Sequence, residues 1–316
     1  MQIFPPNYRP GWSSAAEEVL GRLGSALCAL LLIAAVTPAA AAQGPYADRS
    51  FVAHMRSGLD AFYGRDFQKA RAQFAAAHAL APGDAFALSL SDAAAENIGS
   101  AALRALSESQ EAAVVSRPKD AIAQAALGFT YLFERRLDPR RADDAKDALN
   151  AAIAIAPALP CAHVGLGVYR LSEGATNRAK LEFLAALHEQ PHDVMALEYL
   201  AVIYQRDLDD PARALSYVIN VPNIMPNYAD AYYRLGSIMR DLGQYDAAAR
   251  YLETAIDLDR GHVGEAGHFG LPLLGDVYLK LHKLAAAKKA FALAIVYGEE
   301  PDRAKAELEK IKRGDG

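Results

Sequence analysis

The pentapeptide His188-Glu189-Gln190-Pro191-His192 carries the letters of the H-E-x-x-H pattern, in which two imidazoles bind zinc and the glutamate acts as a base. That chemistry needs both histidines on one face of one helix, a single turn apart. Pro191 would stand inside that helix, where a proline costs about 3 kcal/mol or more. We therefore expect no metal here, and a metal-dependent hydrolase ranks last among the functions considered.

The other chemically active side chains form no site that the sequence can define. His262, His268 and His282 have no carboxylate or cysteine at a metal-ligand spacing, so loop histidines are the favoured interpretation. Cys161, next to Pro160, is expected to be a small buried residue rather than a nucleophile. The sequence also has no phosphate-binding loop and no dinucleotide fingerprint. It therefore predicts no enzyme, no cofactor and no metal.

Composition narrows the class of protein further. The 316 residues are 52% hydrophobic and rich in alanine, with one tryptophan, which favours helix throughout. The net charge is −5 and no run of five like charges occurs. Nucleic-acid binding is not expected, because contacts to phosphates require a basic face.

The N-terminal segment has the parts of a secretory signal. The apolar run Ala26–Val36 follows Arg22 and precedes Pro38 and a run of alanines. We expect cleavage after residue 42, and export to the periplasm or the exterior with no membrane span left after cleavage. An uncleaved anchor is the alternative. The acidic residues before this run suggest that translation begins near Val19, which N-terminal sequencing of the precursor would decide.

The stretch Tyr232–Asp257 predicts two helices joined by a short turn near Gly243. Tyr232, Leu235 and Met239 recur at helical spacing with Gly236 on the same side, and the second half repeats the pattern with small residues. A glycine inside a helix costs about 1 kcal/mol relative to alanine, so Gly236 implies close approach of the neighbouring helix.

Two series of residues recur along the chain with a common period and indicate that this two-helix unit is repeated. Pro82, Pro118, Pro157, Pro191 and Pro226 each follow an alanine-rich run, at intervals of 36, 39, 34 and 35 residues. Pro301 continues the series two periods later. The small residues predicted to pack the helices keep the same spacing, and they are Gly58, Gly128, Gly167, Ala201, Gly236 and Gly275 in the first helices, and Ala70, Ala145, Ala179, Ala214, Ala248 and Ala287 in the second.

These motifs resemble the tetratricopeptide repeat, a helix–turn–helix unit of about 34 residues. The resemblance covers nearly all of residues 51–316 and is weakest in the second unit, which lacks the glycine and has Leu106 where a small residue belongs. It implies an all-α fold, a right-handed α-solenoid of about seven helix pairs with a capping helix. The expected boundaries are a signal at 1–42, a linker at 43–50, the repeats at 51–298 and the capping helix at 299–316.

The resemblance also implies binding of a protein or peptide on the concave side, which the first helices line. By the family's register, the residues expected there are Met55, Leu59, Phe62, Phe129, Phe133, Glu198, Gln205, Asp230, Tyr233, Arg240 and Asp276. The lysine and asparagine set with which the family clamps a C-terminal carboxylate is absent. The leading prediction is a non-catalytic scaffold or adaptor, and the alternative is a structural part of an envelope assembly that binds through its convex face or its ends.

Overall fold

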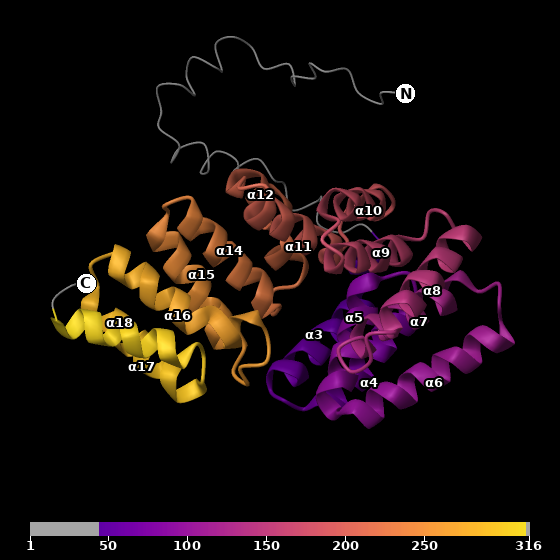
Figure 1. Ribbon diagram of the computed structural model, residues 1–316, viewed down its shortest axis with the longest axis horizontal. Helices are drawn as coiled ribbons and strands as arrows, with labels where there is room; N and C mark the ends of the chain where they lie inside the picture. Colours follow the sequence, from indigo (N-terminus) through magenta and orange to yellow (C-terminus); the bar gives the residue numbers. More distant parts are fainter. Residues whose placement is uncertain (1–43, 314–316) are drawn as a thin grey trace, which may run out of the picture. The chain divides into compact units, whose positions relative to one another are not determined.

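The computed structural model describes residues 44–313, and in that part of the chain all regular structure is helical. Seven helix pairs follow one another, and a single helix closes the series (Figure 1). The first helices are α3 (Arg49–Tyr63), α5 (Ala85–Ile98), α7 (Ala121–Glu134), α9 (Pro160–Ser172), α11 (Val194–Val202), α14 (Ala229–Asp241) and α16 (Glu265–Lys280). The second helices are α4 (Phe67–Leu80), α6 (Ser100–Ser116), α8 (Arg141–Ile155), α10 (Thr176–Glu189), α12 (Pro211–Val218), α15 (Tyr245–Leu258) and α17 (Leu284–Tyr297). The remaining elements are η2 (Gly44–Ala47), η3 (Ile203–Asp207), α13 (Val221–Ile224) and α18 (Pro301–Arg313).

Local sequence signals account for many helix ends. Six helices begin behind an aspartate whose carboxylate accepts backbone N–H groups of the first turn, as Asp84 does from Ala87 at 2.8 Å. The other five are Asp48, Asp66, Asp120, Asp193 and Asp210. At the other end, Pro82, Pro118, Pro157, Pro191 and Pro226 each directly follow the residue that caps a helix. Pro301 differs, because it begins α18.

In five of the seven helix pairs, a glycine of the first helix faces a large residue of the second. A Cβ at Gly236 would lie 2.6 Å from Leu252 Cγ, and a Cβ at Gly128 would lie 2.6 Å from Leu149 Cγ. Phenylalanines fill the same place in three other pairs, Gly58–Phe74, Gly167–Phe183 and Gly275–Phe291. The predicted packing alanines are all fully buried, namely Ala70, Ala145, Ala179, Ala201, Ala214, Ala248 and Ala287.

The fold is therefore an all-α repeat solenoid, as the sequence predicts, with local differences from the expected boundaries. The seventh unit begins at Glu265, so Gly267, Gly270 and His268, the last of which was expected in a loop, lie inside α16. The Asp259 carboxylate explains this early start, because it accepts the N–H groups of Val263, Gly264 and Gly267 at 2.8–3.1 Å. In the second unit, Ser107 is buried one residue after Leu106, which is only partly buried.

The two ends of the array are closed in different ways. At the C-terminal end, α18 buries Ala304 and Ile311 against the last pair and exposes its charged side. At the N-terminal end, the segment expected to be a linker forms η2, and its Tyr46 side chain is buried against Phe51. The predicted signal, residues 1–42, lies outside the described residues. Within residues 44–313, no helix is both long and apolar enough to cross a membrane.

Candidate functional site

The apolar residues predicted to line the groove in the early units belong to the core. Met55, Leu59 and Phe129 are fully buried, Phe62 is 7% exposed, and only Phe133 keeps part of its surface. Phe62 packs against the rings of Phe67 and Phe74 within its own unit. The four buried side chains therefore offer no surface to a partner, and their apolar character is explained by packing between helices.

Connections from the later units cover this side of the first unit. The Gly261 N–H donates to the Tyr63 carbonyl at 2.7 Å, and the Asn227 side chain donates to the Arg56 carbonyl and to Asp60 at 2.9 and 2.8 Å. Figure 1 shows α3 beside the connection between α15 and α16. The contacts join residues about two thirds of the described chain apart, so no local pattern in the sequence could have predicted them.

Two carboxyl groups are buried where the second and fifth units approach each other. Asp84 caps α5 and accepts hydrogen bonds from Tyr46 Oη at 2.9 Å and Gln190 Nε2 at 3.0 Å. Asp193 caps α11, and its Oδ2 is buried without a hydrogen-bond partner among residues 44–313. Burial raises the pKa of both carboxyls, and the negative charge of Asp84 adds to the effect at Asp193. These groups hold the helix starts together and leave no open site.

A second polar cluster encloses three of the predicted groove residues, Glu198, Asp230 and Tyr233. Arg234, 4% exposed, pairs with Glu265 at 2.5 Å and lies 3.5 Å from Glu198. One guanidinium thus faces several carboxyls, and Glu265 takes its shorter contact. Burial raises the pKa of Glu198 to about 8, and burial with the nearby Glu265 charge raises that of Asp230 to about 7. Glu198 and Tyr233 are 8% and 6% exposed, so these two side chains offer little surface to a partner, whereas the Glu265 side chain is 38% exposed.

The other three predicted residues remain partly open to solvent. Gln205, Arg240 and Asp276 come from the fifth, sixth and seventh units, and we call them the polar strip. Gln205 Nε2 donates to Ser237 Oγ at 2.8 Å and to Asp241 Oδ2 at 2.6 Å, and Arg240 also pairs with Asp241. Asp276 pairs with Arg303 of α18. The strip therefore presents hydrogen-bonding groups held in position by their neighbours.

An irregular turn positions the first member of the strip. α11 ends at Val202 and continues into the π-helical turn η3, which carries Gln205. Insertions of this kind widen a helix locally and are frequent at functional sites. Sequence periodicity predicts an unbroken helix here, so the π turn was not foreseen.

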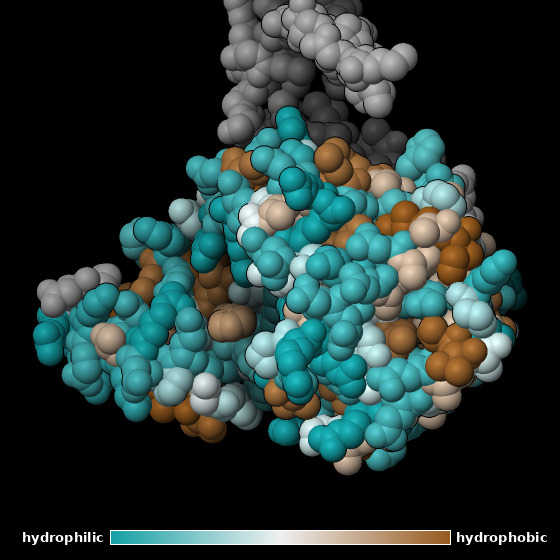
Figure 2. Space-filling model, turned by 45° about the vertical axis from the view of Figure 1, so that its right-hand side comes forward, coloured by the Kyte–Doolittle hydropathy of each residue, from teal (hydrophilic) through white to brown (hydrophobic). Residues whose placement is uncertain are grey.

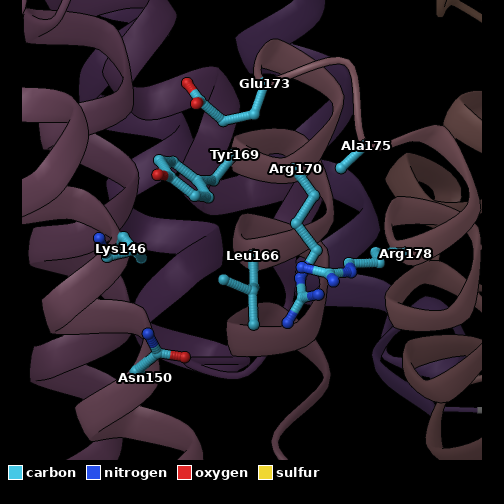
Figure 3. Close-up of a pocket in the computed structure, with 8 residues that line it drawn as sticks. All are labelled: Lys146, Asn150, Leu166, Tyr169, Arg170, Glu173, Ala175 and Arg178. Atoms are coloured by element: carbon cyan, nitrogen blue, oxygen red, sulfur yellow. The ribbon is translucent and has the colours of Figure 1, made fainter.

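A cavity of about 320 Å³ lies between α8, α9 and α10, and it was not predicted either. Lys146 and Asn150 come from α8, Leu166, Tyr169, Arg170 and Glu173 border it from α9 and its end, and Ala175 and Arg178 border it at the start of α10. Figure 3 shows Lys146 and Asn150 on one side of Leu166, and the guanidinium groups of Arg170 and Arg178 on the other. Three cations and one carboxylate thus border one hollow.

The histidines and the cysteine have structural roles. α10 ends at Glu189, so His188 and His192 do not share a helix, as Pro191 predicts. His262 Nδ1 lies 2.9 Å from Glu299 and its ring stacks on Tyr297, while His268 Nδ1 contacts the Gly264 carbonyl. No group of three potential metal ligands occurs in residues 44–313. Burial raises the pKa of the Cys161 thiol to about 12, which keeps it protonated and unreactive.

Several large apolar side chains are exposed on second helices. Val115 of α6, Leu181 of α10 and Val296 of α17 are 82%, 64% and 74% exposed. On the side of the molecule that carries α6, α8 and α10, Figure 2 shows hydrophobic patches among hydrophilic residues. Single exposed apolar residues are ordinary, so these residues mark a surface without defining a site.

Comparison with known proteins agrees with the repeat geometry. A family model described as tetratricopeptide repeat matches residues 229–262, which contain α14 and α15. None of the curated proteins matches this chain.

Solved structures match a larger part of the chain. One, described as the APC/C hetero-tetramer Cut9–Hcn1, superposes with a TM-score of 0.61 at 16% identity, and covers 79% of this chain and 46% of that one. YrrB, described as a TPR protein with an unusual peptide-binding site, has a TM-score of 0.50 at 18% identity over 64% and 99% of the two chains. PilF of Pseudomonas aeruginosa has a TM-score of 0.50 at 15% identity over 83% and 99%. The chain spans less than half the length of the first of these, and at such identities the likeness concerns the fold.

Proposed function

We propose that this chain, which is a tetratricopeptide repeat protein, is a non-catalytic scaffold that binds a protein or peptide partner. The observation that carries the proposal is the polar strip, because Gln205, Arg240 and Asp276 stay partly exposed on consecutive units. Of the other predicted groove residues, only Phe133 and Asp230 are also partly exposed. The peptide-binding site named for YrrB is a property of that protein, and it supports the proposal only as an analogy.

The strip favours a partner segment with polar or charged side chains. Its side chains already contact neighbouring groups, Gln205 and Arg240 through Asp241 and Asp276 through Arg303, so a bound peptide would exchange these contacts for its own. An Arg240 guanidinium and an Asp276 carboxylate on successive units suit a segment that carries both signs of charge. Of the apolar residues expected to line the groove in the early units, only Phe133 keeps part of its surface, so apolar anchoring has little support there.

Site-specific photo-crosslinking tests the strip. A photoreactive residue replaces Gln205 in residues 43–316, the protein is irradiated in extracts of its host, and mass spectrometry identifies the attached partner. The double variant Gln205→Ala and Arg240→Ala should then lose most binding of that purified partner while keeping its helical circular dichroism. Arg250→Ala with Lys288→Ala, on α15 and α17, is the control. Equal binding by the two double variants would exclude the strip.

A second candidate function is a structural role in an envelope assembly, with contact through the second helices. Exposed Val115, Leu181 and Val296 are the observations that favour it. Replacing each by serine should weaken such an assembly and leave strip binding unchanged. Crosslinks concentrated on α6, α10 and α17 rather than on α11, α14 and α16 would select this function.

Export is part of the proposal and depends on the N-terminal sequence alone. The apolar run and the alanines that follow it lead us to propose cleavage before Gln43. Intact-mass measurement of the protein purified from its host should give a chain that begins at Gln43. A mass that includes the apolar run, with recovery in the membrane fraction, would support the uncleaved anchor. Elemental analysis of the same sample, with no stoichiometric metal expected, tests the non-catalytic assignment.

A further inference from the structure

We infer that the cavity between α8, α9 and α10 binds the side-chain carboxylate of an acidic peptide segment. The inference deepens the proposed scaffold function and rests on it, because it names a class of partner. It concerns a surface separate from the polar strip, since the cavity is bordered by α8, α9 and α10 of the third and fourth units. We call it the cationic cavity.

The size of the cationic cavity suits part of a peptide. Its volume of about 320 Å³ corresponds to roughly ten water molecules at liquid density. A single small ion would leave most of that space to water. An acidic side chain together with part of its backbone would fill more of it, and Leu166, 4% exposed, provides an apolar floor for the side-chain methylenes.

Charge decides which side chain fits. Lys146, Arg170 and Arg178 border the cavity, and Glu173 is the one carboxylate among the residues that line it. Lys146 pairs with Asp143, but Asp143 is 79% exposed, and surface pairs of this kind contribute only about 0–1 kcal/mol. A bound carboxylate can therefore replace Asp143 at little cost. Arg178 has no carboxylate within 4.0 Å among residues 44–313.

Arg170 is held ready for such a ligand. Its Nη2 lies 3.1 Å from Glu182 Oε1, and the other oxygen of Glu182 contacts His163 Nδ1 at 2.7 Å. Glu182 thus fixes the guanidinium from one side, and Nε is buried without a hydrogen-bond partner among the described residues. Arginine presents donors in a planar fork that matches a carboxylate, which makes such contacts directional as well as strong.

The N-terminus of α10 adds a positive electrostatic potential that favours an anion. Ala175 precedes the helix and provides no side chain to accept the first N–H groups, and Arg178 adds positive charge within the first turn. Both features disfavour further cations and stabilise an anion nearby. They support the inference that the charged residues of the cavity already carry.

Fluorescence anisotropy with a labelled hexaglutamate peptide, amidated at its C-terminus, tests the inference in low-salt buffer. The unmodified protein should bind it, and the variant Lys146→Gln with Arg178→Gln should bind about tenfold more weakly, because two charge-assisted contacts are lost. The control Arg250→Gln with Lys288→Gln removes the same charge from exposed positions on α15 and α17. It should change binding by no more than about twofold. Thermal melting checks that both variants fold.

Three results would overturn the inference. They are absence of binding by the unmodified protein, equal weakening in the two double variants, and binding of hexaglutamine as tight as that of hexaglutamate. Displacement by inorganic phosphate at far lower concentration than by glutarate would instead assign the cavity to phosphate. If hexaglutamate does not bind but the strip variant loses its partner, only the inference about the cavity fails and the proposed scaffold function stands. If hexaglutamate binds as expected but the strip variant keeps its partner, the polar strip is excluded and the inference about the cavity stands.

Discussion

The helix pairs α14–α15 and α5–α6 are both units of the repeat, but their helices are held in place by different contacts. In the first pair, Gly236 is the eighth residue after Tyr228, which precedes α14, and Leu252 of α15 fills the space that its missing side chain leaves. Gly243, with φ of 72°, lies in the turn between the helices. The segment that the family model matches, residues 229–262, contains this pair.

In the second pair, the same position holds a carboxylic acid. Asp92 is the eighth residue after Asp84, as Gly128, Gly167 and Ala201 are after the residues that precede their own helices. Asp92 is fully buried and accepts a hydrogen bond at 3.2 Å from Thr130, which belongs to the next unit. Only Gly99, with φ of 140°, separates α5 from α6.

Polar contacts to the third unit hold α6 in place. Along its length α6 buries only Leu103 and Ser107. Ser107 Oγ donates to Glu134 Oε1 at 2.7 Å, and the other oxygen of Glu134 pairs with Arg141 Nε at 3.1 Å. The comparison teaches that a small residue joins a helix to its own partner, whereas a carboxylate at that position directs the contacts toward the neighbouring unit.

The largest expected effect comes from filling the glycine position of the regular pair. Gly236→Leu should lower the free energy of unfolding by about 3 kcal/mol, because even a Cβ there would overlap Leu252. Urea denaturation measures the loss. Gly83→Ala is the control, since its added Cβ would meet only Leu159 at 3.8 Å. A loss no larger than that of the control would refute the packing role of Gly236.

Removing the polar anchor of α6 should have the next largest effect. Glu134→Ala leaves Ser107 and Arg141 without their common partner, and we expect a loss of about 2 kcal/mol. Hydrogen exchange should rise in α6 and stay unchanged in α15. If α6 keeps its protection, apolar packing rather than the polar contacts holds it.

Asp92→Asn should stabilise the protein at neutral pH. Burial raises the pKa of Asp92 well above its usual value, so the folded chain binds this proton more tightly than the unfolded chain. The associated stability is present below about pH 4 and is lost as the pH rises toward the folded-state pKa. Asparagine does not titrate, so the variant keeps its stability as the pH rises. We expect its free energy of unfolding to exceed that of the unmodified protein by about 1–2 kcal/mol at neutral pH, and the difference to vanish near pH 4.

Thermal melts across this pH range measure the difference between the two proteins. The exposed Asp147→Asn of α8 is the control, and it should change stability by less than about 0.5 kcal/mol. A constant difference between Asp92→Asn and the unmodified protein at every pH would show that folding does not raise the pKa of Asp92.

The smallest effect is expected at Gly99, the residue between α5 and α6. Gly99→Ala meets no atom within 4 Å, but φ of 140° is strained for any residue with a side chain, and the loss should be about 1 kcal/mol. Gly83→Ala again serves as the comparison. Equal stability of the two variants in urea would mean that the backbone at Gly99 can change its conformation without a loss of stability.

Much of the fold could be predicted because its signals are local. Helix spacing, aspartates before helices and prolines after them depend on neighbouring residues, so α14, α15 and the series of pairs follow from the pattern. The second unit was the weak point of the pattern, and Asp92 is the physical reason. A buried carboxylate at a packing position can be accounted for only once Thr130 is seen beside it.

The candidate sites were less predictable. Register placed Gln205, Arg240 and Asp276 on the same side as Met55 and Glu198, but it could not show which of them another part of the chain covers. The connection that carries Asn227 contacts the first unit over a separation of 171 residues, which no local pattern encodes. The cationic cavity likewise requires three helices to meet before Lys146 and Arg178 border one space.

The sequence by itself determined that this protein is a series of helix pairs, where most of them begin and end, and that a small residue packs most of them. Those properties arise from periodicity and backbone chemistry within about 35 residues. The tertiary structure alone decided which faces stay open, because burial depends on contacts between distant units. It closed the apolar side over Met55 and Leu59, and it left the polar strip and the cationic cavity accessible.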